Sequence, residues 1–148
     1  MSGILIDTNL LVYLMDQNEP QKQAQAARVL DQLELQHTGR LGAQNLAEFI
    51  SVATRKLQPP LTAAKALDQA RLFASMWPVL DTTSQIVLEA ARGMRDYSLS
   101  YYDAQIWASA RLNQVPVVFS EDFQDGMVLE GVKFVDPFAP LFEIEQWG

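Results

Sequence analysis

The feature that most constrains the fold of this chain is the alternation of short apolar runs with longer segments of helical periodicity. The runs typical of strands are residues 3–6 (GILI), 40–42, 79–80, 115–120 (VPVVFS) and 132–135 (VKFV). Between them lie the helical segments 20–36, 44–57, 84–97, one capped by Thr62 and one opened by Ser100. This alternation predicts a single α/β domain whose short central parallel sheet is flanked by helices on both faces.

The spacing of apolar residues also predicts which side of each helix faces the core. In every helical segment we expect one apolar stripe to be buried. The predicted inward positions are Ala24, Ala27, Leu30 and Leu33; Leu46, Phe49, Ile50, Ala53 and Leu57; Ala66, Leu67, Ala70 and Phe73; Ile86, Val87, Ala90 and Met94; and Ile106, Trp107 and Ala110.

Length, cysteine content and the first residues limit the class of protein. A chain of 148 residues, 49% hydrophobic, has the usual size of one domain. The absence of cysteine excludes a disulfide framework, a thiolate zinc site and a thiol nucleophile. Polar residues 7–9 interrupt the first apolar run and no basic leader precedes it, so we expect no signal peptide, no membrane span and a cytoplasmic location.

The formal net charge of -7 argues against nucleic-acid binding, because phosphates are usually attracted by an excess of Lys and Arg. The objection weakens if some of the acids bind divalent ions, which reverse the local field. Arg40, Arg55, Lys56, Arg92 and Arg95 are candidates for binding phosphates, although solvation on helix surfaces explains them equally well.

Two acids directly follow predicted strands. Asp7 follows ILI and Asp122 follows VVFSE. Binding sites in open α/β sheets form beyond the carboxyl ends of strands, so this position favours function. The alternative for Asp7 is a helix cap, but Thr8 or Asn9 could supply the cap instead.

The other acids have stronger structural alternatives. Asp103 lies three residues after Ser100, as in a capping box. Glu48 shares the polar side of its helix with Gln44, Ser51 and Arg55, which is also typical of a solvated face. The cluster SEDFQDG, with Glu121, Asp122 and Asp125, is either an acidic turn or part of a site.

If several of these carboxylates gather in the folded chain, their repulsion must be relieved by a bound cation or by shared protons. Oxygen ligands suit hard divalent ions, so the cofactor we expect is Mg²⁺ or Mn²⁺.

Four segments together resemble a known family. ILIDTNLLVYL, NLAEFISV, LSYYDAQIWASA and VFSEDFQDG resemble, in this order, the acidic motifs of VapC-type PIN-domain toxins, and the resemblance extends from Ile4 to Phe138. It implies a single PIN-like domain over residues 1–138, followed by a tail over residues 139–148. The tail, APLFEIEQWG, either covers core surface or meets a partner.

The resemblance implies a Mg²⁺- or Mn²⁺-dependent endoribonuclease. Its catalytic and metal-binding residues would be Asp7, Glu48, Asp103 and Asp122. Thr8, Asn9 and Ser120 would support them through hydrogen bonds. The family usually has Thr where this chain has Ser120, and the flanking Glu121 and Asp125 leave the identity of the fourth ligand open.

The expected chemistry is metal-assisted hydrolysis of RNA phosphodiester bonds, giving 5′-phosphate and 3′-hydroxyl products. The resemblance further implies an antitoxin protein that holds the enzyme inactive, and a homodimer.

Two other functions stay open at this point. One is a haloacid-dehalogenase-like phosphohydrolase with Asp7 as nucleophile, although that chemistry needs a second acid where this chain has Asn9. The other is a catalytically inactive PIN-fold module that binds RNA or a partner protein.

Overall fold

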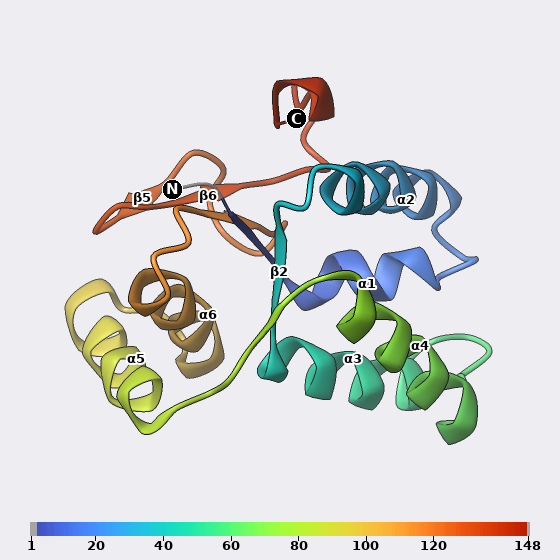
Figure 1. The fold of residues 1–148 in the computed structure, drawn as a ribbon, viewed down its shortest axis with the longest axis horizontal. Helices are drawn as coiled ribbons and strands as arrows, with labels where there is room; N and C mark the ends of the chain where they lie inside the picture. The colour runs from blue at the N-terminus through green and yellow to red at the C-terminus, as the bar shows by residue number, and fades with distance from the viewer. Residues whose placement is uncertain (1–2, 148) are drawn as a thin grey trace.

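The fold is built on a six-stranded sheet, seen in a computed structural model that describes residues 3–147 (Figure 1). The strand order is β3-β2-β1-β4-β6-β5, and every pair is parallel except β5 with β6. The strands are β1 Ile4–Ile6, β2 Gly39–Gly42, β3 Val79–Leu80, β4 Val117–Phe119, β5 Val128–Leu129 and β6 Val132–Val135. The predicted parallel sheet is therefore confirmed, and β5 is an edge strand that the sequence did not reveal.

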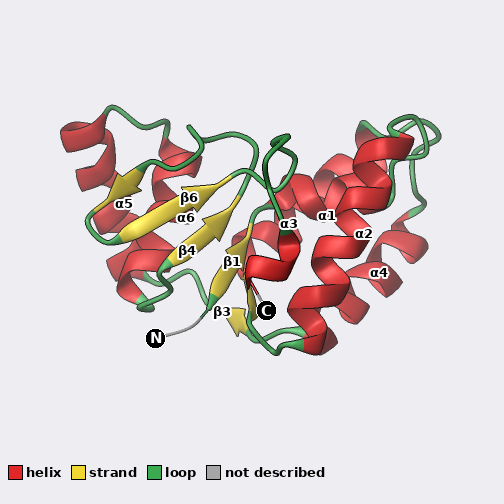
Figure 2. Ribbon diagram, turned by 90° about the horizontal axis from the view of Figure 1, so that it is seen from above, coloured by secondary structure: helices red, strands yellow, loops and turns green. Residues whose placement is uncertain are grey.

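Helices cover both faces of this sheet, as expected. Figures 1 and 2 show α5 and α6 grouped on one side and α1 to α4 on the other. The helices are α1 Thr8–Leu14, α2 Pro20–Leu35, α3 Ala43–Arg55, α4 Ala63–Met76, α5 Ser84–Tyr97, α6 Tyr101–Leu112 and the 3₁₀ helix η1 Ile144–Trp147. None of the helices within residues 3–147 is long and apolar enough to cross a bilayer.

The central strands are apolar on both faces because each face meets a helical layer. Ile4 and Ile6 of β1 pack with α1 to α4, whereas Leu5 between them packs with α5 and α6. Strand β4 repeats this pattern, with Phe119 on the first side and Val118 on the second. Continuous apolar runs are therefore what a sheet buried on both sides requires.

The predicted inward faces of the helices are partly wrong. Five predicted core positions are exposed: Ala24, Ile50, Leu67, Val87 and Met94. Successive helix positions differ by about 100°, so on a helix that is covered along one side only, the neighbour of an inward residue can turn outward. Phe49 and Ala66 take the inward positions, and their neighbours Ile50 and Leu67 turn outward.

The C-terminal residues fold back onto the core. The rings of Phe142 and Trp147 stand edge-on to Phe119, at centroid distances of 5.5 and 5.3 Å, and Ile144 is buried. Of the two roles considered for the tail, the structure shows the covering of core surface by its described residues, 139–147. The domain division at residue 138 stays a prediction.

Gly93 marks the closest approach of α5 to α6. A methyl group at this position would lie 2.9 Å from two ring carbons of Trp107, which is fully buried. The Trp107 indole nitrogen donates a 3.1 Å hydrogen bond to the carbonyl of Leu129, so the ring cannot shift freely.

We therefore expect Gly93→Ala to destabilise the protein by about 1–3 kcal/mol through overpacking, although Ala is normally the better helix former. The control is Ala91→Gly at an exposed position of the same helix, which should cost about 1 kcal/mol through helix propensity alone. Urea unfolding measures the free energy of unfolding of both variants. A more stable Gly93→Ala protein would contradict this account of the α5–α6 contact.

Candidate active site

The carboxyl ends of three adjacent parallel strands, β2, β1 and β4, meet at one edge of the sheet, and Figure 2 shows β1 and β4 side by side. Strand β1 ends one residue before Asp7, β4 ends one residue before Ser120, and β2 leads directly into α3. The register pairs Ile6 with Phe119, so Asp7 and Ser120 leave the sheet side by side. This is the position at which open α/β sheets form their sites.

Asp7 lies buried at the centre of this edge, with only 6% of its surface exposed. Its Oδ1 accepts a hydrogen bond from the Thr8 amide at 2.8 Å, and its Oδ2 accepts one from the Ser120 hydroxyl at 2.6 Å. The Asn45 side-chain amide adds a longer contact of 3.4 Å to Oδ1. These contacts join the ends of three strands through one carboxylate.

Asp7 is also the N-cap of α1, so the expectation that Thr8 or Asn9 caps this helix was wrong. The helix begins at Thr8, directly after the strand, and Asp7 is the residue that keeps extended backbone angles. A cap needs such angles, so neither Thr8 nor Asn9 can serve. Asp7 therefore caps α1 and lies in the candidate site at the same time.

Burial raises the pKa of Asp7 from 3.8 to about 6. The hydrogen bonds from Ser120 and Thr8 oppose this rise, whereas the negative charges of Asp122 and Glu48 add to it. Asp122 and Glu48 are therefore close enough to influence the protonation of Asp7.

Asp122 is held beside Asp7 through Ser120 and Asn9. The Asn9 side-chain amide donates to Ser120 Oγ and to Asp122 Oδ2, both at 3.2 Å. The Asp122 backbone amide donates to the same serine oxygen at 3.0 Å. Ser120 thus accepts two hydrogen bonds and donates its own to Asp7.

Glu48 reaches the site from α3. Its Oε2 lies 3.5 Å from the Thr8 hydroxyl, and its Oε1 accepts a 2.6 Å hydrogen bond from Gln44. Glu48 forms no ion pair with Arg55 on the same helix, and the Arg55 guanidinium donates hydrogen bonds to Ser51 instead.

Asp103 enters from the first turn of α6. Ser100 caps this helix, as the spacing predicts, and accepts the Asp103 amide at 3.4 Å. Burial raises the pKa of Asp103 above its usual range, the Ser100 side chain opposes the rise, and the charge of Asp122 adds to it. The structure thus places Asp103 in the same electrostatic group as Asp122.

These four carboxylates are not neutralised by the protein. In the described part of the chain, no Lys, Arg or His nitrogen lies within 4.0 Å of any of their oxygens. The buried Asn9 Oδ1 beside them also lacks a donor among these residues. No three acidic or His side chains between residues 3 and 147 are grouped closely enough to surround one ion as they stand.

Glu121 and Asp125 lie outside this group. Glu121 forms a 2.8 Å ion pair with Lys22 and accepts a hydrogen bond from the Tyr13 hydroxyl. Asp125 Oδ1 accepts the backbone amide of Asp136 at 2.9 Å. Both carboxylates therefore stabilise the loop that carries Asp122 through an ion pair and hydrogen bonds.

Sequence reasoning missed the side-chain amides that link the site. Asn45 is fully buried, accepts the Gly42 amide at 2.9 Å and donates to Thr8 Oγ1 at 3.2 Å. Gln105 donates to Gln44 at 2.8 Å, which connects α6 to α3. A polar residue at position 45, one residue before Leu46 and four before Phe49, is the signal that could have indicated a buried amide.

Comparison with known proteins agrees with this architecture. The PIN domain family matches residues 4–124. Three similar solved structures are a DNA-bound VapBC from Salmonella typhimurium, a toxin–antitoxin complex from Klebsiella pneumoniae, and VapC20 from Mycobacterium tuberculosis, described as a sarcin–ricin loop cleaving toxin. A search of curated proteins found no significant match.

These structural similarities span nearly whole chains at low identity. The Salmonella chain has a TM-score of 0.66 at 20% identity, with 93% of this chain and 99% of that chain covered. The Klebsiella chain has 0.66 at 18%, covering 92% and 98%, and the Mycobacterium chain 0.64 at 16%, covering 81% and 92%. At such identities the similarity shows the fold.

The chain belongs to the PIN-domain family, whose match covers most of its length. The predicted PIN fold, an α/β domain with a mostly parallel sheet, is thereby confirmed. This assignment disfavours the haloacid-dehalogenase-like alternative, and Asn9 in the structure serves as a hydrogen-bond donor to Ser120 and Asp122.

The raised pKa of Asp7 predicts a cost in stability. Because the folded protein binds this proton more tightly than the unfolded chain, ionised Asp7 lowers the free energy of unfolding as the pH rises from 3.8 to about 6. A shift of this size corresponds to about 3 kcal/mol. In chelator at about pH 7.5 we expect Asp7→Asn to be more stable than the wild type by about 1–3 kcal/mol, a gain that disappears towards pH 4.

Urea unfolding at several pH values measures this difference. Asp31→Asn, at an exposed position of α2, is the control and should change stability little at any pH. A less stable Asp7→Asn protein at pH 7.5 would show that the carboxylate is not a destabilising buried charge.

Proposed function

We propose that the protein is a Mg²⁺- or Mn²⁺-dependent endoribonuclease, of the kind that acts as a VapC-like toxin. Asp7, Glu48, Asp103 and Asp122 would be its catalytic and metal-binding residues. The observation that carries the proposal is the gathering of these acids, from four separate elements of a PIN-domain chain, without a counter-cation.

The chemistry of the donors supports a divalent ion. All candidate ligands are carboxylate oxygens, which suit Mg²⁺ and Mn²⁺. Burial disfavours the charged form of Asp7, and the charges of Asp122 and Glu48 add to this, so a cation beside Asp7 would relieve both effects. The buried Asn9 Oδ1 is a further acceptor that an ion or its water would satisfy.

Neighbouring side chains and one backbone amide would hold the carboxylate ligands in position. Ser120 and the Thr8 amide hold both oxygens of Asp7, and Asn9 holds Asp122. Gln44 restrains Glu48. When bound, the divalent ion would lower the pKa of the attacking water and stabilise charge on the RNA phosphate.

Asp122 is the preferred fourth acid. Asp122 accepts a hydrogen bond from Asn9 and its charge acts on Asp7. In contrast, Glu121 is bound by Lys22 and Tyr13, and Asp125 accepts the backbone amide of Asp136. Glu121 and Asp125 would then support the loop without meeting the ion.

We also propose a protein antitoxin as partner. Its support is that structural neighbours were solved as toxin–antitoxin complexes, including VapBC assemblies. A homodimer and a cytoplasmic location, both expected from the sequence, remain parts of the same proposal.

The test is RNA cleavage by purified protein with a panel of transfer, ribosomal and messenger RNAs. We expect cleavage with Mg²⁺ or Mn²⁺, none in chelator, and products with 5′-phosphate ends. Asp7→Asn and Asp103→Asn should each lose at least about 100-fold in rate, because even residues behind metal ligands are worth about 10- to 100-fold.

Two comparisons sharpen this assay. Asp31→Asn should keep the wild-type rate, and Asp122→Asn should lose far more activity than Asp125→Asn. Equal cleavage by wild type, Asp7→Asn and Asp103→Asn would refute the proposed site. RNA binding without cleavage in the presence of either ion would instead support the inactive module.

A further inference from the structure

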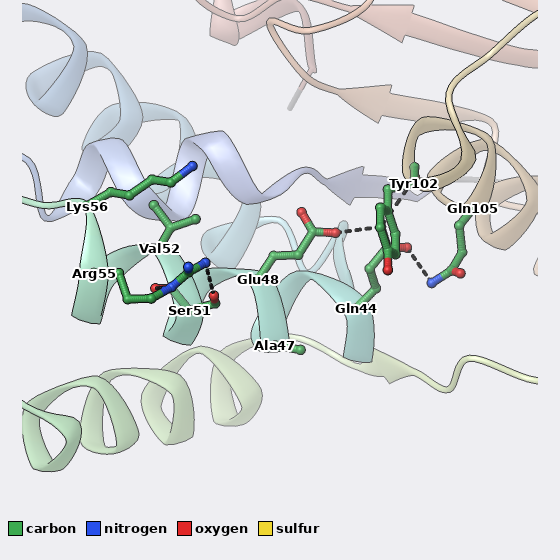
Figure 3. Close-up of a pocket in the computed structure, with 9 residues that line it drawn as sticks. All are labelled: Gln44, Ala47, Glu48, Ser51, Val52, Arg55, Lys56, Tyr102 and Gln105. Carbon is green, nitrogen blue, oxygen red and sulfur yellow. Dashed lines mark hydrogen bonds between the residues drawn. The ribbon is translucent and has the colours of Figure 1, made fainter.

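Two glutamines join α6 to Glu48 through a row of hydrogen bonds. Figure 3 shows Gln105, Gln44 and Glu48 along one groove, which has a volume of about 690 Å³. Gln105 Nε2 donates to Gln44 Oε1 at 2.8 Å, and Gln44 Nε2 donates to Glu48 Oε1 at 2.6 Å. Gln44 and Gln105 thus form an amide relay that ends on a carboxylate of the candidate site.

The hydrogen bonds of Gln44 fix the direction of this amide relay. Its Nε2 also donates to the carbonyl of Tyr102 at 3.3 Å, so its two acceptors are Glu48 and Tyr102. Reversing the Gln44 amide would place its oxygen against an ionised carboxylate and a carbonyl, neither of which can donate a hydrogen bond. The donors of Gln44 are therefore directed at Glu48, and its oxygen is left for Gln105.

The amide relay connects helices that belong to different layers of the fold. Phe49 of α3 lies in one apolar cluster of the core, whereas Trp107 of α6 lies in the other. Helix α3 carries Glu48, and the first turn of α6 carries Asp103. Because these helices pack in separate clusters, a hydrogen bond between them helps to set the separation of the two acids.

Gln105 is a polar residue at a buried position of α6. It is 7% exposed, and its neighbours in the chain, Ala104 and Ile106, are buried apolar residues. Burying an amide costs free energy unless it is hydrogen-bonded, and the Gln44 oxygen accepts the hydrogen bond of Gln105. Met has a similar length and would fill this position without a polar group. The choice of glutamine favours a role that needs a donor directed at Gln44.

Gln44 makes the shortest polar contact of the Glu48 carboxylate. The other carboxylate oxygen lies 3.5 Å from the Thr8 hydroxyl, at the limit of a hydrogen bond, and Glu48 forms no ion pair within residues 3–147. A long side chain has many rotamers unless contacts restrict it. Without Gln44, the half-buried Glu48 could turn away into the groove.

We propose that Gln44 and Gln105 are positioning residues that orient Glu48 for a divalent ion without contacting the ion themselves. The inference rests on the metal site of the proposed function. Partners that hold metal ligands fix the orientation of those ligands, and their loss typically lowers metal affinity by about 10- to 100-fold. Gln105 acts through Gln44, because Gln44 lies between it and Glu48.

The test measures Mn²⁺ binding apart from cleavage. Metal-free protein is titrated with Mn²⁺, and electron paramagnetic resonance measures the free ion. Binding that is lost in Asp7→Asn defines the site. Gln44→Met and Gln105→Met, which keep the length of the side chain, should each weaken this binding by about 10-fold or more.

Gln85→Met is the matched control for this titration. Gln85 is exposed at the start of α5, where it lines a separate hollow with Asn113 at the opposite end of α6 from Asp103. The control should therefore bind Mn²⁺ as the wild type does.

The double variant Gln44→Met/Gln105→Met tests whether the two glutamines act as a relay. Effects of residues that act through one another do not add. The double variant should therefore bind Mn²⁺ no more weakly than Gln44→Met alone. Urea unfolding in chelator tests the alternative that the glutamines only hold the helices together. That role predicts a loss of stability, with unchanged Mn²⁺ affinity of the folded protein.

Three outcomes would overturn the inference: wild-type Mn²⁺ affinity in the single variants, additive losses in the double variant, or equal weakening in Gln85→Met. If the wild type then still shows Asp7-dependent Mn²⁺ binding and cleaves RNA, only the inference fails. Mn²⁺ binding that depends on Gln44 and Gln105, in a protein that cleaves no RNA, would refute the ribonuclease proposal alone. Wild-type protein without Asp7-dependent binding would refute both.

Discussion

The buried carboxylate of Asp7 is the constraint on which the rest of this site depends. It accepts hydrogen bonds from the residue that follows β1, from Ser120 after β4 and from Asn45 after β2. One side chain therefore fixes the relative position of three strand ends. The same burial raises its pKa to about 6, so the ionised form of this carboxylate costs stability at neutral pH. Such local cost is typical of functional positions.

The RNA that we propose as substrate is anionic, whereas the chain carries a net charge of -7. Much of the basic charge is used in ion pairs away from the site, such as those of Arg92 and Arg111 with Glu89. Arg55 and Lys56, which form no ion pair within residues 3–147, line a groove together with Glu48, and the candidate carboxylates are suited to a divalent ion. The net charge alone therefore does not exclude an anionic ligand, because these cations and a bound divalent ion would act locally.

Much of the fold could be predicted from the sequence, because strands buried on both faces and helices with clear caps have strong local patterns. Thr62 and Ser100 cap their helices as expected, and α5 has the predicted bounds. The inward faces were less predictable because they depend on the partner element. Helix α5 packs through Ala90 and Gly93 against Trp107, which leaves the larger Val87 and Met94 exposed.

The candidate site was also only partly predictable, because local motifs indicate single residues but not the contacts between distant elements. The motifs singled out the four acids as candidates, and the strand-end positions of Asp7 and Asp122 predicted that these two would lie at the carboxyl ends of the strands. They could not show that Asn45, Gln44 and Gln105 connect them, since these contacts join α3 to β1 and to α6. Nor could they show that Lys22 and Tyr13 occupy Glu121, because that contact links α1, α2 and the loop after β4.

The central claim is that carboxylates distant in sequence form one divalent-metal site. Anomalous X-ray scattering from crystals grown with Mn²⁺ tests it most directly. The account predicts a manganese peak among Asp7, Asp103 and Asp122 in the wild type, and its loss in Asp7→Asn crystals grown in the same way. Well-diffracting wild-type crystals with no peak at these side chains, or with manganese bound only elsewhere, would contradict it.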